Sequence, residues 1–495
     1  MLIKITLFFI CFHLLPGYAI YQNTNWGNFQ KIIFSSVTGV FISLFFFQLI
    51  KFTHLPFNWI YSIPVIAVFI ILFLKKNNSS SGHNKNIWPT LSILLASITL
   101  FYFFGQKIIS FDAESITIIS KANDSIFTLL CSLSWTFGDK ILYKGYHYYD
   151  SLLFHVFNEF TGLSLIHTLN LYFILLNIIT PVILFLILKK ITSNYFVIAL
   201  ALTLFMFDIG LFHVFIEKNI KYGNTGFLSH LHNIPILFAR ILILIIIERL
   251  LFFTKNKNWV SIVSTALLIS ISLKIKINLF IMAFGVLAIY TTIRYFNNKN
   301  IKNEIFILAL TIILSSVNIY LLIVDHISKT AHLSPLFFGY SDNKIVTITL
   351  VLLSLLSYWI LLMKKPNPQN ELELSIGIMA CLGVLVGYLF IELERPHHGN
   401  FFWFRIISFY LFSILYAFYY SSFNRWKKFI SSLIILTTCY LGFGEYKNYS
   451  IDRSDTITKS EFISKIYFHD TLTPRRHYLN TLDTKKVEHL LFQNK

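Results

Sequence analysis

Long, continuous apolar runs separated by short polar connections dominate this sequence. The runs lie at residues 4–20, 31–50, 58–74, 88–105, 165–188, 195–216, 233–253, 259–273, 277–293, 304–324, 345–363, 373–392, 402–420 and 429–443. Most of them approach the roughly 20 residues that a helix needs to cross a bilayer. Because they do not alternate with polar residues, they indicate helices and not the strands of a barrel. The pattern predicts an all-α, polytopic membrane protein with about 13–14 transmembrane helices.

The polar connections differ in charge in a regular way. Basic stretches such as "KKITSN", "TKNKN" and "KKPNPQN" fall at every second connection, and Lys and Arg collect in cytoplasmic loops. The connections expected in the cytoplasm are those near 77–86, 254–258, 297–303, 364–370 and 424–428. Those expected on the outer face are 106–164, 217–232, 325–344, 394–401 and the tail from residue 444. The outer connections hold most of the His, Asp and aromatic residues, so we expect function at the outer face.

These expectations divide the chain into four regions. N-terminal transmembrane helices span 1–105, an outer, periplasmic loop with the candidate active site spans 106–164, a transmembrane helical core spans 165–443, and an outward-facing tail spans 444–495. The tail is polar, and "TKKVEHLLFQ" within it predicts a short helix.

The first apolar run has two interpretations. "MLIKITLFFICFHLLPGYAI" resembles a signal peptide, because one lysine precedes a short apolar core and small residues. A first transmembrane helix is the alternative. The alternation of basic connections places Met1 outside, whereas Lys4 favours the inside.

Composition supports a membrane location. Charged residues make up 13% of the chain, against roughly 25% in soluble domains. The net charge of +18 is explained by the cytoplasmic loops, with anionic membrane lipids as a compatible partner and no need for nucleic acid. The four cysteines lie at 11, 131, 381 and 439, without metal-ligand spacing, and are expected to be packing residues.

The longest outer loop carries the candidate catalytic acids. Asp112 and Glu114 leave the membrane after an apolar run; they can act as a base, bind a cation, or simply end a helix in solvent. Asp124 precedes apolar residues at 126, 127, 129, 130 and 133, a spacing that predicts an interfacial helix. Asp124 is therefore either the N-cap of that helix or an acid that faces a cavity at the membrane surface.

Aromatic residues follow in the same loop. Tyr146, His147, Tyr148 and Tyr149 open the stretch "KGYHYYDSLLFHVFNEFTGLS", which predicts a turn and a second helix entering the membrane. The four side chains form either an interfacial aromatic belt or the wall of a sugar site.

The order of these motifs resembles the first large outer loop of GT-C-type membrane glycosyltransferases. The resemblance is to a poorly characterised bacterial group with a "D..(F/H)...(N/S)SL......YH" pattern, and it continues through "SHLHN" at 229–233, "LKIKINLF" at 273–280 and "HHGNFFWFR" at 397–405. It implies a GT-C-like fold and an enzyme that takes a sugar from a polyprenyl-phosphate donor. Its acceptor would be a cell-surface glycan or a lipid-linked acceptor, and the reaction would take place at the outer face of the bacterial inner (cytoplasmic) membrane.

The resemblance also assigns roles. Asp124 matches the general base, with Asp112 and Glu114 in reserve. Cations on the outer side would stabilise the leaving lipid phosphate: Arg240, Lys274, Lys276, Arg395 and Arg405. The lysine pair can instead snorkel to the interface.

Polar residues of the later outer connections complete the expected sugar site. They are His230, His232, His397, His398 and Asn400. Alternatively, these histidines bind a divalent cation. No other cofactor is implied.

Two other functions fit a chain of this kind. A polysaccharide polymerase or ligase usually relies on paired arginines in a large outer loop, and 106–164 contains lysine but no arginine. A lipid-linked glycan transporter would carry out no chemistry and often shows inverted repeats. Asp208, the main acid inside an apolar run, is compatible with either transport or the outer cavity.

Overall fold

Helices form most of the chain that the structure describes. The computed structural model describes residues 1–53, 55–75, 87–105, 115–119, 129, 132–133, 148–207, 234–254, 258–326, 333–335, 371–392, 402–451, 454–458 and 484–493. The α-helices are α1 (Leu2–Phe8), α2 (Leu15–Tyr21), α3 (Asn28–Phe52), α4 (Ser62–Lys75), α5 (Trp88–Gly105), α7 (Tyr148–Thr161), α8 (Leu165–Ile191), α9 (Tyr195–Phe207), α11 (Ile234–Phe253), α12 (Trp259–Ile275), α13 (Ile277–Phe296), α14 (Lys302–His326), α16 (Glu371–Leu389), α17 (Phe402–Tyr419), α18 (Arg425–Ile451) and α21 (Thr484–Phe492). The π-helix η1 (Phe9–Leu14) joins α1 to α2, and η2 (Phe57–Tyr61) and η5 (Tyr420–Ser422) are short 3-10 helices.

The helices coincide with the predicted apolar runs. Each run contains a helix except 345–363, which lies outside the described residues. The short helices expected after residue 144 and in the C-terminal tail are present as α7 and α21. Apolar runs of this length therefore identified the helices directly.

Among the described residues, four helices are long and apolar enough to cross a membrane. They are Leu2–Tyr21, Asn28–Ile50, Leu165–Ile191 and Ile277–Phe296, and five shorter apolar helices accompany them. The predicted class, a helical membrane protein, is confirmed at this coarser level. The number of spans expected from the sequence stays a prediction.

Two small sheets were not expected from an all-α pattern. β1 (Ser115–Ile119) pairs antiparallel with β4 (Ser454–Thr458), and β2 (Leu333–Pro335) pairs antiparallel with β3 (Phe390–Glu392). The β1 sequence "SITII" is rich in β-branched residues, which favour strands. Both pairings join parts of the chain that the basic connections place on, or next to, the same outer side.

The chain forms two compact units. Unit 1 comprises Met1–Ile183, Leu231–Ile245 and Ser450–Lys495. Unit 2 comprises Leu184–His230 and Ile246–Tyr449.

The N-terminal helices of unit 1 pack closely on α3. A Cβ atom on Gly39 of α3 would overlap the carbonyl oxygen of His13, and one on Gly17 of α2 would overlap that of Ser35. The hydroxyl of Ser43 donates a hydrogen bond of 2.5 Å to the carbonyl oxygen of Phe12 in η1. Small residues at such contacts let membrane helices approach closely. The first apolar run is thus a helix of membrane-spanning length built into unit 1.

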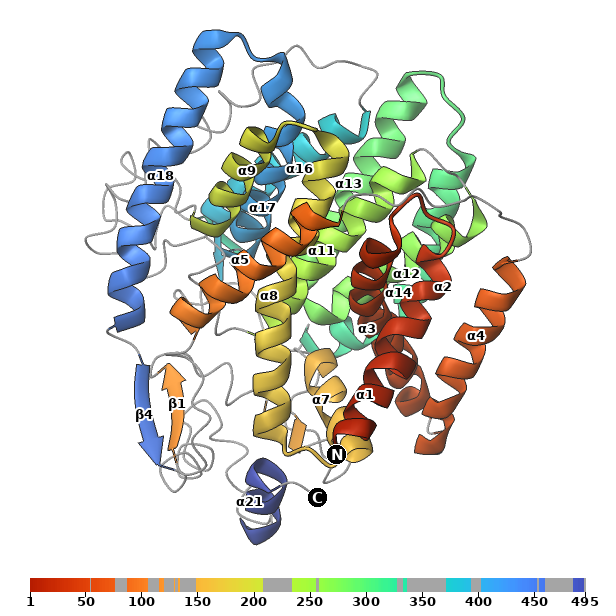
Figure 1. The fold of residues 1–495 in the computed structure, drawn as a ribbon. Helices are drawn as coiled ribbons and strands as arrows, with labels where there is room; N and C mark the ends of the chain where they lie inside the picture. Colours follow the sequence, from red (N-terminus) through yellow and green to blue (C-terminus); the bar gives the residue numbers. More distant parts are fainter. Residues whose placement is uncertain are drawn as a thin grey trace. The chain divides into compact units, whose positions relative to one another are not determined.

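The amino end of this helix lies beside α7. The ring of Phe8 contacts those of Phe157 and Phe160, with centroids 4.8 and 5.5 Å apart, and Figure 1 shows the N-terminus next to α7. Because α7 ends the loop expected on the outer face, this contact agrees with the alternation of basic connections and not with the inward preference of Lys4.

Unit 2 is built around α13, α16 and α17. Helix α16 packs on both of the others, and α9 packs on α17. Gly383 of α16 lies so close to Ser408 and Met282 that a Cβ atom would overlap their side chains. This close packing places the first turn of α16 beside the connection that joins α13 to α14.

Candidate functional site

Most of the expected site lies outside the described residues. This holds for Asp112, Glu114, Asp124, Tyr146, His147, Asp208, His230, His232, Arg395, His397, His398 and Asn400. The backbones of Tyr148 and Tyr149 begin α7, and the backbone of Arg405 lies in α17. The structure therefore describes helices next to the expected site and the side chains of three of its candidate cations.

Helix α7 is the support of the outer loop. Its residues from Ser151 to Asn158 are all buried, so α7 is an internal helix of unit 1. Gly162 follows the last helical residue, Thr161, and its φ of 76° suits the left-handed residue that commonly ends a helix. The side-chain amide of Asn158 then donates to the carbonyl oxygen of Leu163 at 2.5 Å. These contacts fix the point where the outer loop returns to the membrane helices.

Aromatic rings hold α7 in place. The ring of Phe154 lies 5.3 Å from that of Tyr172 in α8 and 6.4 Å from that of Phe238 in α11. The ring of Phe157 lies 5.5 Å from Tyr172 and 4.8 Å from Phe8. The burial of several aromatic rings contributes strongly to the stability of this packing, and their edge-on or tilted angles define the position of α7.

A histidine and a tyrosine form a polar pair inside this cluster. The Nε2 atom of His13 and the hydroxyl oxygen of Tyr172 are 2.8 Å apart, and both side chains are buried. Sequence reasoning passed over His13 because it sits in an ordinary apolar run. An ionisable residue within such a run was the available signal.

Three of the expected cations, Arg240, Lys274 and Lys276, lie in or next to described helices. Arg240 is 1% exposed in α11 of unit 1. In unit 2, Lys274 lies in the last turn of α12, where a cation suits the helix dipole. Lys276 is the extended residue between α12 and α13 and is 6% exposed. A lysine that snorkels keeps its charged end in water, so the burial of Lys276 disfavours the snorkelling interpretation for that residue.

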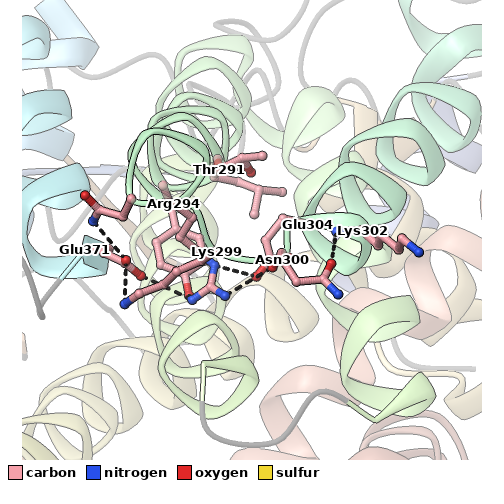
Figure 2. A network of polar contacts seen from close by, with 10 residues as sticks. Thr291, Arg294, Lys299, Asn300, Lys302, Glu304 and Glu371 are labelled. Atoms are coloured by element: carbon pink, nitrogen blue, oxygen red, sulfur yellow. Dashed lines mark hydrogen bonds and ion pairs between the residues drawn. The ribbon is translucent and has the colours of Figure 1, made fainter.

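A second polar cluster, which we call the α16 ion-pair cluster, lies in unit 2 (Figure 2). It consists of Arg294, Asn297, Lys299, Glu304 and Glu371. The Glu371 carboxylate accepts from Lys299 at 2.7 Å, from Asn297 at 3.1 Å and from Arg294 at 3.2 Å. Arg294 also lies 3.2 Å from the buried carboxylate of Glu304.

Local backbone geometry builds this cluster. Asn298 has a φ of 53°, which Asn tolerates better than most residues. The amides of Asn298 and Lys299 donate back to the carbonyl oxygens of Tyr295 and Arg294, the hydrogen-bond pattern of a Schellman motif. This turn folds the chain back at the end of α13 and brings Lys299 next to Glu371.

The charges of the α16 ion-pair cluster compensate one another. Burial of the Glu371 carboxyl would by itself raise its pKa. Hydrogen bonds from Lys299 and Asn297 and the charges of Lys299 and Arg294 outweigh this effect, so the pKa lies below its ordinary value. Two cations opposite two carboxylates tie α13, α14 and α16 together, so the charges of these four side chains balance. The sequence predicted only basic spacers here, although Glu304 and Glu371 in first helical turns were a visible signal.

No cluster of three or more His, Cys, Asp or Glu side chains with metal-binding geometry occurs within the described residues. None of the protein-family models, curated proteins or solved structures compared with this chain matches it.

Proposed function

We propose that this chain is a GT-C-type glycosyltransferase of the bacterial inner membrane. It moves a sugar from a polyprenyl-phosphate donor to a cell-surface glycan or lipid-linked acceptor at the outer face. The proposal is supported by the helical membrane architecture and by the order of motifs from the outer loop 106–164 to "HHGNFFWFR".

The observation that carries the proposal is the way this loop is built. It gathers acids and aromatic residues between two apolar runs, and it ends in α7, whose buried face is packed against aromatic rings of α1, α8 and α11. A spacer between spans needs no such anchor. Catalytic groups do, because they must be held in a fixed geometry relative to the substrate.

The proposed reaction is a displacement at the anomeric carbon. The Asp124 carboxylate takes the proton of the acceptor hydroxyl, whose oxygen forms a bond to the anomeric carbon. The bond from that carbon to the phosphate oxygen breaks, and the polyprenyl phosphate leaves with the electron pair. Asp112 and Glu114 are the other candidate bases.

Cations and aromatic residues have the remaining roles. Arg240, Lys274, Lys276, Arg395 and Arg405 are the candidates that stabilise the phosphate. The sugar would lie against the residues from Tyr146 to Tyr149 and accept hydrogen bonds from the histidines of the later outer connections.

A transfer assay in detergent tests the proposal. Purified protein is incubated with labelled polyprenyl-phosphate sugars and a lipid extract as acceptor, and products are separated and identified by mass. We expect the label to move to an acceptor and free polyprenyl phosphate to appear. A transporter would give no turnover in micelles, because they separate no compartments; its activity would appear only in sealed vesicles.

A further inference from the structure

The His13–Tyr172 pair is a polar contact placed inside two membrane-spanning helices. The two residues belong to the spans Leu2–Tyr21 and Leu165–Ile191. They are 159 positions apart in sequence and make a 2.8 Å hydrogen bond. Polar residues in such positions are uncommon and usually functional, yet neither residue belongs to the proposed catalytic or binding set.

The backbone around His13 is adapted to this contact. Residues Phe9–Leu14 form a π-helix between two α-helical segments, a rare element that is frequent at functional sites. The wide turn would leave a main-chain carbonyl group without its usual partner, and the Ser43 hydroxyl donates to the carbonyl oxygen of Phe12. Gly39 provides the space for the His13 carbonyl group. Two residues of α3 thus accommodate the turn that carries His13.

The pair also lies against α7. The Tyr172 ring contacts Phe154 and Phe157 of α7. The His13 ring contacts Phe9 at 4.5 Å and Phe8 at 5.7 Å, and both of these rings contact Phe157. A displacement of either partner would therefore be transmitted to the buried face of α7.

We propose that His13 and Tyr172 are positioning residues for the outer loop. Their hydrogen bond holds the N-terminal helix and α8 in the relative position against which α7 packs. Helix α7, which begins with Tyr148 and Tyr149, in turn fixes the end of the outer loop. The inference rests on the proposed function for its effect on catalysis. It rests on the contacts of unit 1 alone for its effect on α7.

Isosteric and rescuing substitutions test the inference. Tyr172→Phe removes only the hydroxyl, and His13→Phe keeps an aromatic ring without a polar atom. His13→Gln restores a group that can donate and accept. Tyr21→Phe is the matched control, because Tyr21 is a fully buried tyrosine of the same N-terminal segment whose ring stacks on Phe34 of α3.

Two measurements are made on each detergent-purified, monodisperse variant. Hydrogen–deuterium exchange of peptides covering 148–161 reports on α7. We expect it to rise by about twofold to tenfold in Tyr172→Phe and His13→Phe, the range that the loss of one buried hydrogen bond allows. The transfer assay reports kcat and KM; we expect kcat to fall by about tenfold or more with KM nearly constant. His13→Gln should recover most of both values, and Tyr21→Phe should match wild type.

The outcomes separate the two proposals. Wild-type exchange in Tyr172→Phe and His13→Phe overturns the inference, whether or not the protein transfers sugar. Faster exchange with unchanged kcat shows a structural contact only and overturns the positioning role. Absence of transfer by wild-type protein overturns the proposed function, while the exchange measurement still decides whether the pair seats α7.

Discussion

Replacement of Glu371 by glutamine is expected to loosen one side of unit 2. The substitution keeps the size and shape of the side chain but removes its charge. Glu371 is 4% exposed and accepts hydrogen bonds from Lys299, Asn297 and Arg294. In Glu371→Gln, Arg294 keeps Glu304 at 3.2 Å, whereas Lys299 loses the carboxylate it contacts at 2.7 Å.

The contacts of Glu371 determine how much folding free energy the substitution removes. Removal of one partner of a buried ion pair costs about 3–5 kcal/mol, and a hydrogen bond to a charged group contributes about 1.5–3 kcal/mol. Lys299 is 42% exposed, so its charge can be rehydrated and its share must be reduced. We therefore expect a loss of about 3 kcal/mol. For a folding unit of this size that corresponds to a fall in Tm of roughly 5–10 °C.

Thermal unfolding in detergent measures this loss. Glu488→Gln is the control, because Glu488 is an exposed glutamate of α21 in unit 1. We expect it to melt with the wild-type protein. A Glu371→Gln variant that melts within about 1 °C of this control would refute the stabilising role of the α16 ion-pair cluster.

The pH dependence of the same comparison gives a second test. The pKa of Glu371 in the folded protein lies below its ordinary value, which is about 4.3 for an unfolded glutamate. The unfolded chain therefore binds the proton first, and the stabilisation is complete above about pH 5 and lost as the pH falls through the folded pKa. The Tm difference between wild type and Glu371→Gln should be constant from about pH 5 to about pH 7 and should shrink as the pH falls below the ordinary pKa of a glutamate. A difference that does not change with pH would contradict the assignment of the charge effect to this carboxylate.

Three further predictions concern packing, topology and donor binding. Gly39→Ala should lower Tm strongly, because the new Cβ atom meets the main chain at His13, whereas Gly285→Ala meets only the flexible side chain of Met379 and should cost less; equal melting of the two would contradict the close contact of η1 with α3. A cysteine at Asn300 should react with membrane-impermeant reagents only from the cytoplasmic side and one at Gln493 only from outside, and labelling near 300 from outside would overturn the topology. Arg405→Ala should weaken binding of a polyprenyl-phosphate sugar, measured by titration, more than it lowers Tm; normal donor binding by that variant would make Arg405 a structural residue.

The sequence predicted what depends on local pattern. Continuous apolar runs located the helices, and the amphipathic stretch after residue 144 located α7, because length and periodicity are local properties. The same patterns could not show that α7 would be buried, since burial depends on α1, α8 and α11 packing around it.

Contacts between distant parts of the chain were not predictable from such patterns. His13 meets Tyr172, Arg294 meets Glu371 across 77 positions, and Ser115 of β1 pairs with Thr458 of β4. A local signal marks a single residue such as His13 or Glu371 but does not identify its partner, because only the tertiary fold brings the two together. The candidate acids and histidines of the outer connections lie outside the described residues, so their assignment depends on the order of motifs in the sequence.

The proposed glycosyl transfer requires the outer loop 106–164 to supply the base. The most direct test is the detergent transfer assay on wild type and Asp124→Asn, with Asp112→Asn and Glu114→Gln in parallel. Asparagine caps a helix as well as aspartate does, so Asp124→Asn separates a catalytic role from a capping role. We predict that wild type transfers the labelled sugar and that Asp124→Asn loses about 10²–10⁴-fold in rate at unchanged Tm. Wild-type rates in all three variants would contradict a catalytic role for the acids of this loop.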